Sequence, residues 1–337
     1  MKFASLLISI ILIFSMFCGC ANKADLNSSS STPSVIKDTS STVLSSEPTS
    51  KTEEGSSSKT SSIVLKPSSK PIVSKAENTN TGNTVIINGK TFTVTDPNNK
   101  RGLSTKRFGY GFGVAKNEKR PELSLDNQKK FDSFKGVTAL AVDTKTKEKI
   151  MYLTFDNGYE YKNLTGKILD VLKEKKVKAA FFPTLSYLKN NKAFVKRMIN
   201  EGHIVGNHSA THPDFTTISR KEMANEIQRV DKYLNDNFGY STTYFRFPTG
   251  AYSESSLELV TSIGYKSIFW SVAYADWDTE DQKGKQNAID TVTSRFHPGA
   301  VILLHAISED NANALGEIID KAHSMGYRFA TLDEYFK

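Results

Sequence analysis

The sequence of 337 residues predicts an α/β fold in which parallel strands alternate with helices. Three observations favour this fold. Short apolar runs alternate with amphipathic stretches about seven times after residue 148, a pattern typical of strands joined by crossover helices. Helix-start and helix-end residues border the amphipathic stretches, and polar signatures follow several of the apolar runs. The alternation suits either a β/α barrel or an open sheet, because both are built from the same repeating unit.

The apolar runs are the predicted strands. They span residues 149–155, 178–183, 203–206, 243–247, 266–271, 300–304 and 327–330. The first run is dense in large apolar residues from Met151 to Phe155, which predicts a buried strand. The sixth, from Val301 to Leu304, is the most hydrophobic run of the domain.

The amphipathic stretches between these runs are the predicted helices. They lie near residues 163–175, 191–201, 220–237, 253–263, 285–296 and 311–325. Ser219 followed by Glu222 is a capping box at the start of the third helix. Gly264 and Gly326 stand where a C′ glycine ends a helix, since glycine adopts the left-handed backbone there at no steric cost.

The N-terminal residues 1–20 are predicted to be a signal peptide. Residues 3–17 are almost wholly apolar after Lys2, too short a run for a transmembrane helix but typical of a secretory signal. The run ends at Cys18-Gly19-Cys20, which resembles a bacterial lipobox with Phe17 at the usual leucine position. Cys20 would then be lipidated and become the mature N-terminus; an uncleaved membrane anchor is the alternative. Either way, we expect an exported protein held at the outer face of the cell membrane.

The segment after the signal divides into a tether and an N-terminal extension. Residues 21–81 are dominated by Ser, Thr, Lys and Pro, and they cannot bury enough apolar surface to offset the entropy of ordering. We therefore expect a disordered tether. The extension, residues 82–147, begins with a predicted β-hairpin from Thr84 to Val94, because Asn88-Gly89 supplies the positive φ angles of a type I′ turn.

Cysteine content and charge exclude some classes of site. Cys18 and Cys20 are the only cysteines, so the folded part has no disulfide, no cysteine-ligated metal and no thiol nucleophile. The net charge of +8 would attract an anionic polymer such as the cell wall, although a basic surface with no specific partner explains it equally well. We expect a monomer with no nucleic-acid partner.

Five polar signatures follow in order along the chain. They are Thr154-Phe-Asp156-Asn157-Gly158-Tyr159, His208-Ser-Ala-Thr-His212, Arg246-Phe-Pro-Thr-Gly250, Asp276-Trp277 and Leu304-His305. Most of them fall at predicted strand ends, and α/β folds place their chemistry at the carboxyl ends of parallel strands. Five such signatures in sequence predict one shared site.

The His208–His212 pair is a candidate metal site. A spacing of four residues can aim two imidazoles at one ion, and Pro213 disfavours a helix, which places the pair on a loop or turn. Zn²⁺, or Fe or Co, suits two histidines with an oxygen ligand and an open position for water. A chance surface or core pair is the alternative.

Asp156 is a candidate general base. At a strand end beside an ion it could deprotonate a bound water, whereas the alternative is an Asx-turn residue before Gly158. Arg246 ends another apolar run and could hold the Asp156 carboxylate by paired hydrogen bonds, keeping it ionised. An ordinary structural salt bridge is the alternative for Arg246.

His305 is a candidate general acid. It closes the most hydrophobic run, and histidine is the side chain that holds a proton near neutral pH. Asp276 could hydrogen-bond His305 and raise its pKa, with Trp277 walling the pocket. The alternatives are a satisfied core histidine and a core tryptophan. His203, His297 and His323 have no obvious partners in the sequence, and we expect structural or surface roles for them.

Across residues 148–334 these signatures resemble the polysaccharide deacetylase, or NodB-homology, family of carbohydrate esterases. Its motifs run in the order TFDDG, H(S/T)xxH, RxPxG, a D-W element and LxLH. The resemblance implies a distorted (β/α) barrel and a polysaccharide deacetylase domain. It implies the catalytic base at Asp156, metal ligands at His208 and His212, a tether for the base at Arg246, an acid-orienting residue at Asp276 and the acid at His305. It also implies an acetate-pocket residue at Leu303 and an oxyanion donor at the Thr249 N–H.

Two positions depart from the family pattern. The family has a second aspartate, its third metal ligand, where this chain has Asn157. An amide oxygen is a neutral and weaker ligand, so a divalent metal, with Zn²⁺ the expected ion, should bind with reduced affinity. The first aspartate of the D-x-x-D-W element is replaced by Ala273.

The departures resemble a subgroup, the δ-lactam-biosynthetic de-N-acetylases. The shared features include Asn157-Gly-Tyr-Glu160, Gly206-Asn-His-Ser209, Phe269-Trp-Ser-Val272 and His297-Pro-Gly-Ala300. This resemblance implies removal of acetate from N-acetylmuramic acid in peptidoglycan, as in the muramic δ-lactam of spore cortex, so sporulation is one expected setting and vegetative wall the other. An N-acetylglucosamine or chitin-type deacetylase is the enzymatic alternative. A wall-binding lipoprotein with a decayed site is the non-enzymatic alternative.

Overall fold

A computed structural model describes residues 82–337, so the predicted signal peptide, Cys20 and the tether of residues 21–81 lie outside the described residues. The described part begins with a two-stranded antiparallel hairpin, β1 (Thr84–Ile87) and β2 (Lys90–Thr93). Its turn residues Asn88 and Gly89 have φ angles of 50° and 71°, as a type I′ turn requires. The predicted hairpin is confirmed.

Seven parallel strands confirm the predicted alternation. They are β4 (Ile150–Asn157), β5 (Ala180–Pro183), β6 (Ile204–Val205), β7 (Tyr244–Phe245), β8 (Lys266–Ile268), β9 (Ala300–His305) and β10 (Arg328–Phe329). In the first sheet β4 pairs with β5, β9 and β10, and β5 pairs with β6. In the second sheet β7 pairs with β8.

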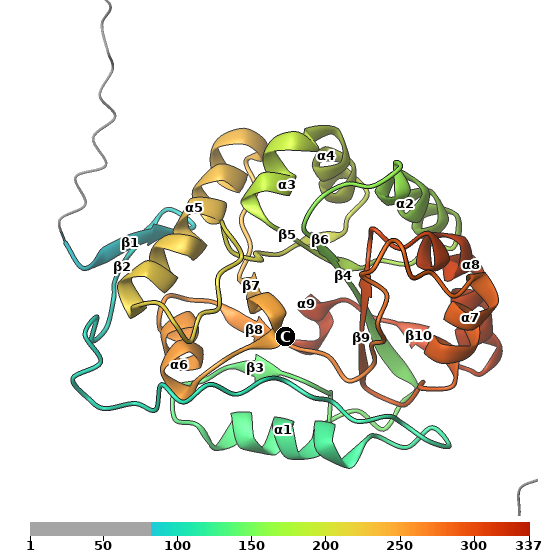
Figure 1. Cartoon of the computed structure of the whole chain (residues 1–337), viewed down its shortest axis with the longest axis horizontal. Helices are drawn as coiled ribbons and strands as arrows, with labels where there is room; N and C mark the ends of the chain where they lie inside the picture. Colours follow the sequence, from blue (N-terminus) through green and yellow to red (C-terminus); the bar gives the residue numbers. More distant parts are fainter. Residues whose placement is uncertain (1–81) are drawn as a thin grey trace, which may run out of the picture. The chain divides into compact units, whose positions relative to one another are not determined.

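The two sheets are joined into a distorted barrel. A parallel bridge between Asn207 and Phe245 connects β6 to β7, and one between Val272 and Ile302 connects the segment after β8 to β9. The helices surround the strands, as Figure 1 shows. The barrel is therefore the correct choice between the two architectures that the alternation allowed.

The helices largely follow the prediction. They are α1 (Glu122–Ser133), α2 (Leu164–Glu174), α3 (Leu185–Asn190), α4 (Lys192–Asn200), α5 (Arg220–Phe238), α6 (Glu254–Ser262), α7 (Lys285–Thr293), α8 (Glu309–Ser324) and α9 (Leu332–Tyr335), with a 3₁₀ turn η1 (Pro248–Gly250). Six were expected, and α1, α3 and α9 were not. Both hydrogen bonds of the Ser219–Glu222 capping box are present. Gly264 and Gly326 have φ angles of 92° and 82°, as helix-ending glycines should.

The barrel begins earlier in the chain than the expected boundary at residue 148. A short strand, β3 (Ala139–Leu140), pairs in parallel with β8. The Asp143 N–H then donates a 2.9 Å hydrogen bond to the Gly299 carbonyl just before β9. Part of the N-terminal extension is thus built into the barrel wall. Two residues of strand are too short for a period-2 pattern, which is why sequence reasoning missed β3.

Strand β4 runs through the centre of the fold, and all eight of its residues are buried. Its odd-numbered side chains from Met151 to Phe155 join the apolar layer that includes residues of α2 and α8. Its even-numbered side chains Ile150 and Tyr152 join the apolar layer inside the barrel. Burial on both faces explains the continuous apolar run. By the same alternation, Asp156 faces the barrel interior and Asn157 faces the helices.

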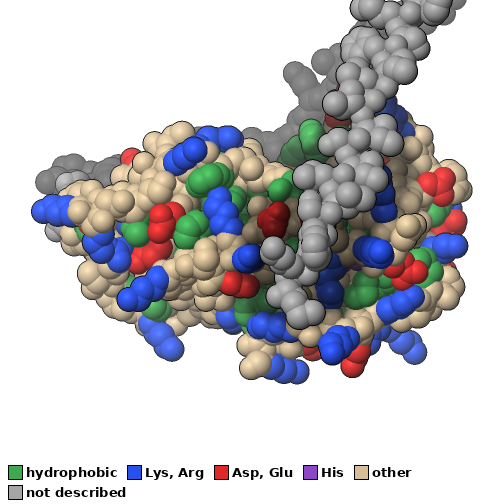
Figure 2. Space-filling model, turned by 90° about the horizontal axis from the view of Figure 1, so that it is seen from below, with side chains coloured by type: hydrophobic (Ala, Val, Ile, Leu, Met, Phe, Trp, Pro, Cys, Tyr) green, Lys and Arg blue, Asp and Glu red, His purple; other side chains and the backbone are tan. Residues whose placement is uncertain are grey.

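Positive charge is spread diffusely over the one face that Figure 2 shows. Figure 2 shows Lys and Arg side chains spread over the face seen from below, with Asp and Glu side chains among them. Such a face can attract an anionic polymer without marking a single binding site. Among residues 82–337, no helix is both long enough and apolar enough to span a bilayer.

We predict that Gly299→Ala destabilises the barrel. Gly299 has a φ of 76°, and a Cβ atom there would lie 2.1 Å from the Asp143 carbonyl oxygen. Gly136 is a matched control, because its φ is 73° and nothing lies within 4 Å of its Cβ position. In urea unfolding, Gly136→Ala should lower the free energy of unfolding by about 1 kcal/mol through backbone strain alone. Gly299→Ala should lower it by at least about 2 kcal/mol more. Equal losses would contradict the close approach of Gly299, just before β9, to Asp143 in the segment after β3.

Candidate active site

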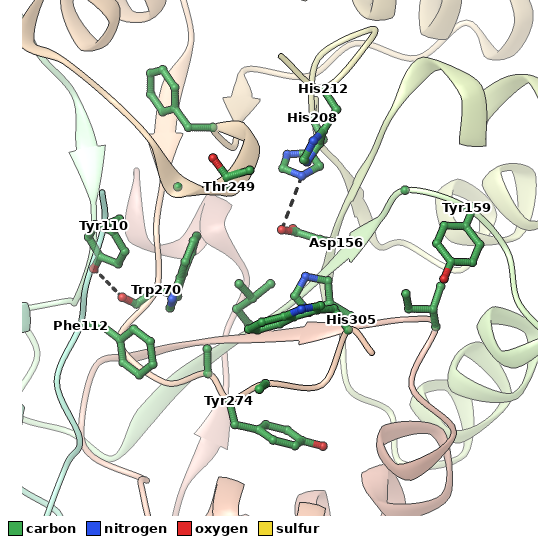
Figure 3. Close-up of a pocket in the computed structure, with 18 of the residues that line it drawn as sticks. Tyr110, Phe112, Asp156, Tyr159, His208, His212, Thr249, Trp270, Tyr274 and His305 are labelled. Carbon is green, nitrogen blue, oxygen red and sulfur yellow. Dashed lines mark hydrogen bonds and ion pairs between the residues drawn. The ribbon is translucent and has the colours of Figure 1, made fainter. Parts of the chain in front are cut away.

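A cavity of about 780 Å³ is lined by residues from the ends of the barrel strands and the loops that follow them. Residues of all five predicted signatures line it, namely Asp156, His208, His212, Thr249, Trp277 and His305. Figure 3 shows the two histidines on one side of Asp156 and His305 on the other. The predicted convergence of the five signatures on one cavity is therefore seen in the structure.

The Asp156 carboxylate is held by Arg246, whose side chain is fully buried. The Nη1 group of Arg246 donates to Asp156 Oδ1 over 2.9 Å, and its Nη2 group donates to Thr154 Oγ1 over 2.9 Å. Arg246 therefore makes one hydrogen bond to the carboxylate and not the expected two, because its Nη2 group donates to Thr154 instead. Burial alone would raise the pKa of Asp156, but the charge and hydrogen bond of Arg246, together with the nearby His208 and His305, outweigh burial and hold this pKa below its usual value. Asp156 is thus an ionised base.

His208 lies next to the second carboxylate oxygen of Asp156. Its Nε2 atom is 3.6 Å from Asp156 Oδ2, while its Nδ1 atom is 2.9 Å from the Arg246 carbonyl. A carbonyl can only accept, so Nδ1 carries the proton and the Nε2 lone pair faces the cavity. Burial lowers the pKa of His208 to about 4 and lowers that of His212 in the same direction. Both imidazoles are therefore neutral near pH 7, the form that binds metal.

The two histidines fit a divalent cation. Their ring centroids are 4.8 Å apart, and His212 has a left-handed φ of 58°, so the pair lies on a turn as expected. Among residues 82–337, no three His, Cys, Asp or Glu side chains are spaced to hold an ion. The described residues thus offer a cation two imidazole nitrogens and leave other positions for water or substrate.

Asn157, the expected third ligand, does not line the cavity. Its side chain is fully buried on the helix-facing side of β4. There the amide lies beside the Tyr187 hydroxyl, in a geometry that falls short of a hydrogen bond. The physical reason is the strand alternation, which turns residue 157 away from the face that carries Asp156. The structure thus places Asn157 with the helices and not with the histidines.

His305 is oriented by Asp276. Its Nδ1 group lies 2.6 Å from Asp276 Oδ1, and its backbone N–H donates to Asp276 Oδ2 over 2.8 Å. The Asn311 side chain donates to the same Oδ2 atom over 2.5 Å and so fixes the carboxylate. Burial alone would lower the pKa of His305, but the charges of Asp276 and Asp156 outweigh burial and raise it. His305 is therefore suited to donate a proton. Its Nδ1 atom contacts Asp276, which leaves Nε2 as the ring nitrogen available to a group in the cavity.

The base and the acid are paired across two strands. Asp156 on β4 lies directly opposite His305 on β9 in the parallel register. Side chains at paired positions of neighbouring strands point to the same face of the sheet. The barrel backbone itself therefore holds the two groups on either side of one reaction space.

The remaining predicted residues form walls of the cavity. Trp277 is 57% exposed, and its ring lies 5.8 Å from that of His305, so it walls the mouth of the cavity and is not a core residue. Leu303 lines the interior. Thr249 also lines it and has a strained φ of 55° within η1.

Sequence reasoning missed several lining residues that lie on loops. Tyr110 and Phe112 come from the N-terminal extension, and Trp270, Tyr274 and Arg295 come from loops beside β8 and β9. The Tyr110 hydroxyl donates to the Trp270 carbonyl over 2.5 Å and ties the extension to the barrel. The glycine and aromatic pattern from residue 108 to 113 is the only signal that could have indicated this wall.

The other histidines stand apart from the cavity, as expected. The buried His203 accepts a hydrogen bond from the Ala179 N–H at Nδ1 over 3.1 Å. His297 is buried beside the Pro298 carbonyl, and His323 is exposed on α8. These three residues serve the fold or the surface.

Comparisons with known proteins agree with this geometry. A family model described as "Polysaccharide deacetylase" matches residues 143–268. The peptidoglycan-N-acetylmuramic acid deacetylase PdaA of Bacillus subtilis is 44% identical over 190 residues, which cover 56% of this chain and 72% of PdaA. The solved structure of Bacillus subtilis PdaA, a family 4 carbohydrate esterase, matches with a TM-score of 0.65 at 38% identity, over 69% of this chain and 97% of that one. The peptidoglycan-N-acetylglucosamine deacetylase PgdA of Listeria monocytogenes is 39% identical over 194 residues, 57% of this chain and 40% of PgdA.

We predict that Asp276→Asn lowers the pKa of His305. Asp276 raises this pKa in the wild type, so loss of its charge leaves burial to dominate and the imidazole releases its proton at lower pH. An opposite charge in contact typically accounts for one pH unit or more, so the midpoint should fall by at least about that amount. NMR titration of the imidazole resonances measures it, with the exposed Asp170→Asn as the control. An unchanged or higher midpoint in Asp276→Asn would contradict the role of Asp276.

Proposed function

The chain belongs to the polysaccharide deacetylase family, and on that premise we propose that it removes acetate from N-acetylmuramic acid residues of peptidoglycan. The observation that carries the proposal is the pairing of an ionised Asp156 with His305 across β4 and β9 in one cavity. Each group has its own orienting partner, Arg246 for the base and Asp276 for the acid. Amide hydrolysis needs both functions on opposite sides of the same carbonyl carbon.

The hydrolysis proceeds by proton transfers between these residues, water and substrate. Asp156 accepts a proton from water as the water oxygen bonds to the acetamide carbonyl carbon. The carbonyl oxygen gains negative charge, and the Thr249 N–H is proposed to stabilise it. His305 then donates its proton to the amine nitrogen while the carbon–nitrogen bond breaks. The products are acetate and a sugar with a free amine.

The two neutral histidines are proposed to hold a divalent cation, with Zn²⁺ as the expected ion. When bound, such an ion supplies positive charge beside the reacting carbonyl. His208 presents its Nε2 lone pair because the Arg246 carbonyl occupies Nδ1. Because Asn157 lies on the other face of β4, we assign the protein's contribution to His208 and His212 alone.

The choice of sugar rests on the relatives. PdaA is named for N-acetylmuramic acid and is 44% identical, and the solved PdaA structure spans most of the described chain. PgdA is named for N-acetylglucosamine and is 39% identical over a similar length, so that sugar is the alternative substrate. A non-enzymatic wall-binding role is disfavoured, because Asp156 contacts Arg246 and His305 contacts Asp276, the two orienting residues that the sequence predicts.

The cellular setting is proposed from the sequence. A lipid anchor at Cys20 would hold the enzyme at the outer face of the cell membrane, and the Ser/Thr-rich residues 21–81 would let it reach the wall. Action as a monomer and a role in forming the muramic δ-lactam of spores belong to the same proposal. The +8 net charge supports contact with an anionic wall.

We predict that Asp156→Ala and His305→Ala each lower kcat for acetate release from purified peptidoglycan glycans by about 10²–10⁴. The reason is that each variant removes one proton-transfer partner. Asp170→Ala and His323→Ala are matched controls on exposed helical positions and should retain the wild-type rate. Acetate release at the wild-type rate by either site variant would contradict the assigned role.

We also predict which residues retain metal. After reconstitution with Zn²⁺, His208→Ala and His212→Ala should each lose most of the bound zinc measured by elemental analysis. Asn157→Ala should keep a wild-type zinc content, because its side chain does not reach the cavity. Thermal melts check that each variant is folded. Loss of zinc from a folded Asn157→Ala to the level of His208→Ala would contradict the two-histidine assignment.

A further inference from the structure

Arg295 stands out among the side chains that line the cavity. Of the described residues lining it, Arg295 is the only lysine or arginine. Its side chain is partly buried, and burial lowers the pKa of its guanidinium. Its hydrogen bond within the described chain goes from Nη1 to the Ala273 carbonyl. Most of the guanidinium donors therefore remain available to a ligand.

Unlike Arg295, two buried arginines of the barrel each have a carboxylate partner. Arg246 pairs with Asp156, and Arg220 pairs with Glu258. Removing a cation from water is costly, and a carboxylate partner normally offsets that cost. Within residues 82–337, Arg295 has no such carboxylate partner. A guanidinium that is partly desolvated, faces a cavity and lacks a counter-ion is suited to bind an anionic group of a ligand.

Arg295 belongs to the same wall as the general acid. It follows α7 and precedes β9, the strand that ends at His305. The Ala273 carbonyl that holds its guanidinium comes directly after Val272. The Val272 carbonyl in turn accepts a 2.8 Å hydrogen bond from the N–H of Leu303, two residues before His305. A short run of backbone contacts thus connects the cation to the acid.

The two alternative sugars differ in one group near the reacting amide. Muramic acid carries a lactyl ether at C3, next to the C2 acetamide, and glucosamine carries a hydroxyl there. A free lactyl group ends in a carboxylate, which matches the planar fork of a guanidinium. C2 and C3 are neighbouring ring carbons. A muramic acid ring whose acetamide lies between Asp156 and His305 therefore has its lactyl carboxylate in the same cavity, which Arg295 also lines.

We propose that Arg295 binds the lactyl carboxylate of the muramic acid residue being deacetylated, and that this contact makes the enzyme select muramic acid over glucosamine. The proposal rests on the proposed deacetylase function. Arg295 then acts as a specificity residue and takes no part in proton transfer. It supplies binding energy through the lactyl group, which is attached to C3, the ring carbon next to the one that carries the amide.

The test compares two substrates that differ only in the carboxylate. One is a muramic-acid oligosaccharide with a free lactyl carboxylate, and the other is the same glycan with this group converted to a methylamide. For the wild type, the methylamide should raise KM on the order of 10–100-fold with a small change in kcat, as expected for loss of a charge-assisted pair. Arg295→Gln should raise KM for the free carboxylate by a similar factor. The variant should not distinguish the two substrates, because the interacting cation is gone.

The controls separate this contact from a structural effect. Arg295→Lys keeps the charge and should recover part of the discrimination, and the exposed Arg229→Gln should behave as the wild type. Equal losses on both substrates in Arg295→Gln, or a variant that still prefers the carboxylate, would overturn the proposal. The proposed function fails separately, if the wild type releases acetate from glucosamine oligomers but from neither muramic substrate.

Discussion

The buried Arg246 guanidinium is the interaction on which the active end of the barrel depends. It bonds to Asp156 and Thr154 on β4 and to the Ile268 carbonyl on β8, while its own carbonyl holds His208. One buried residue thus links the sheet of β4 with that of β8, and it contacts both the proposed base and a proposed metal ligand. A buried ion pair of this kind adds little to stability in general, but loss of one partner leaves an uncompensated charge. The arrangement therefore specifies the geometry of the site more than it stabilises the fold.

Because side chains alternate along a strand, neighbouring residues of β4 face different surroundings. Asp156 faces the barrel interior and meets Arg246, whereas Asn157 faces the helices near Tyr187. The same alternation on β9 turns His305 into the cavity opposite Asp156. Backbone register thereby places the proposed acid and base opposite one another. Arg246 contributes to the lowered pKa of Asp156, and Asp276 contributes to the raised pKa of His305.

Much of this fold could be predicted because parallel strands buried on both faces leave continuous apolar runs, as β4 and β9 do. The proposed base Asp156 and the proposed acid His305 could be predicted because they stand at the ends of those runs. β3 could not, since two residues carry no periodicity, and α1 could not, since its sequence is mostly polar. The orientation of the Asn157 side chain could not be predicted, because it depends on whether β4 continues through residue 157. The contact between Arg295 and the Ala273 carbonyl could not be predicted either, because it joins two loops that lie apart in the sequence and leaves no local pattern.

The most direct test of the account is mass spectrometry of glycan strands digested after treatment with the purified enzyme. The account predicts loss of one acetyl group from muramic acid residues, with glucosamine residues left acetylated. Loss of acetyl groups from glucosamine alone would contradict the proposed substrate and the role given to Arg295. Unchanged glycans after treatment with zinc-loaded enzyme would contradict the assignment of Asp156 and His305 as a working base and acid.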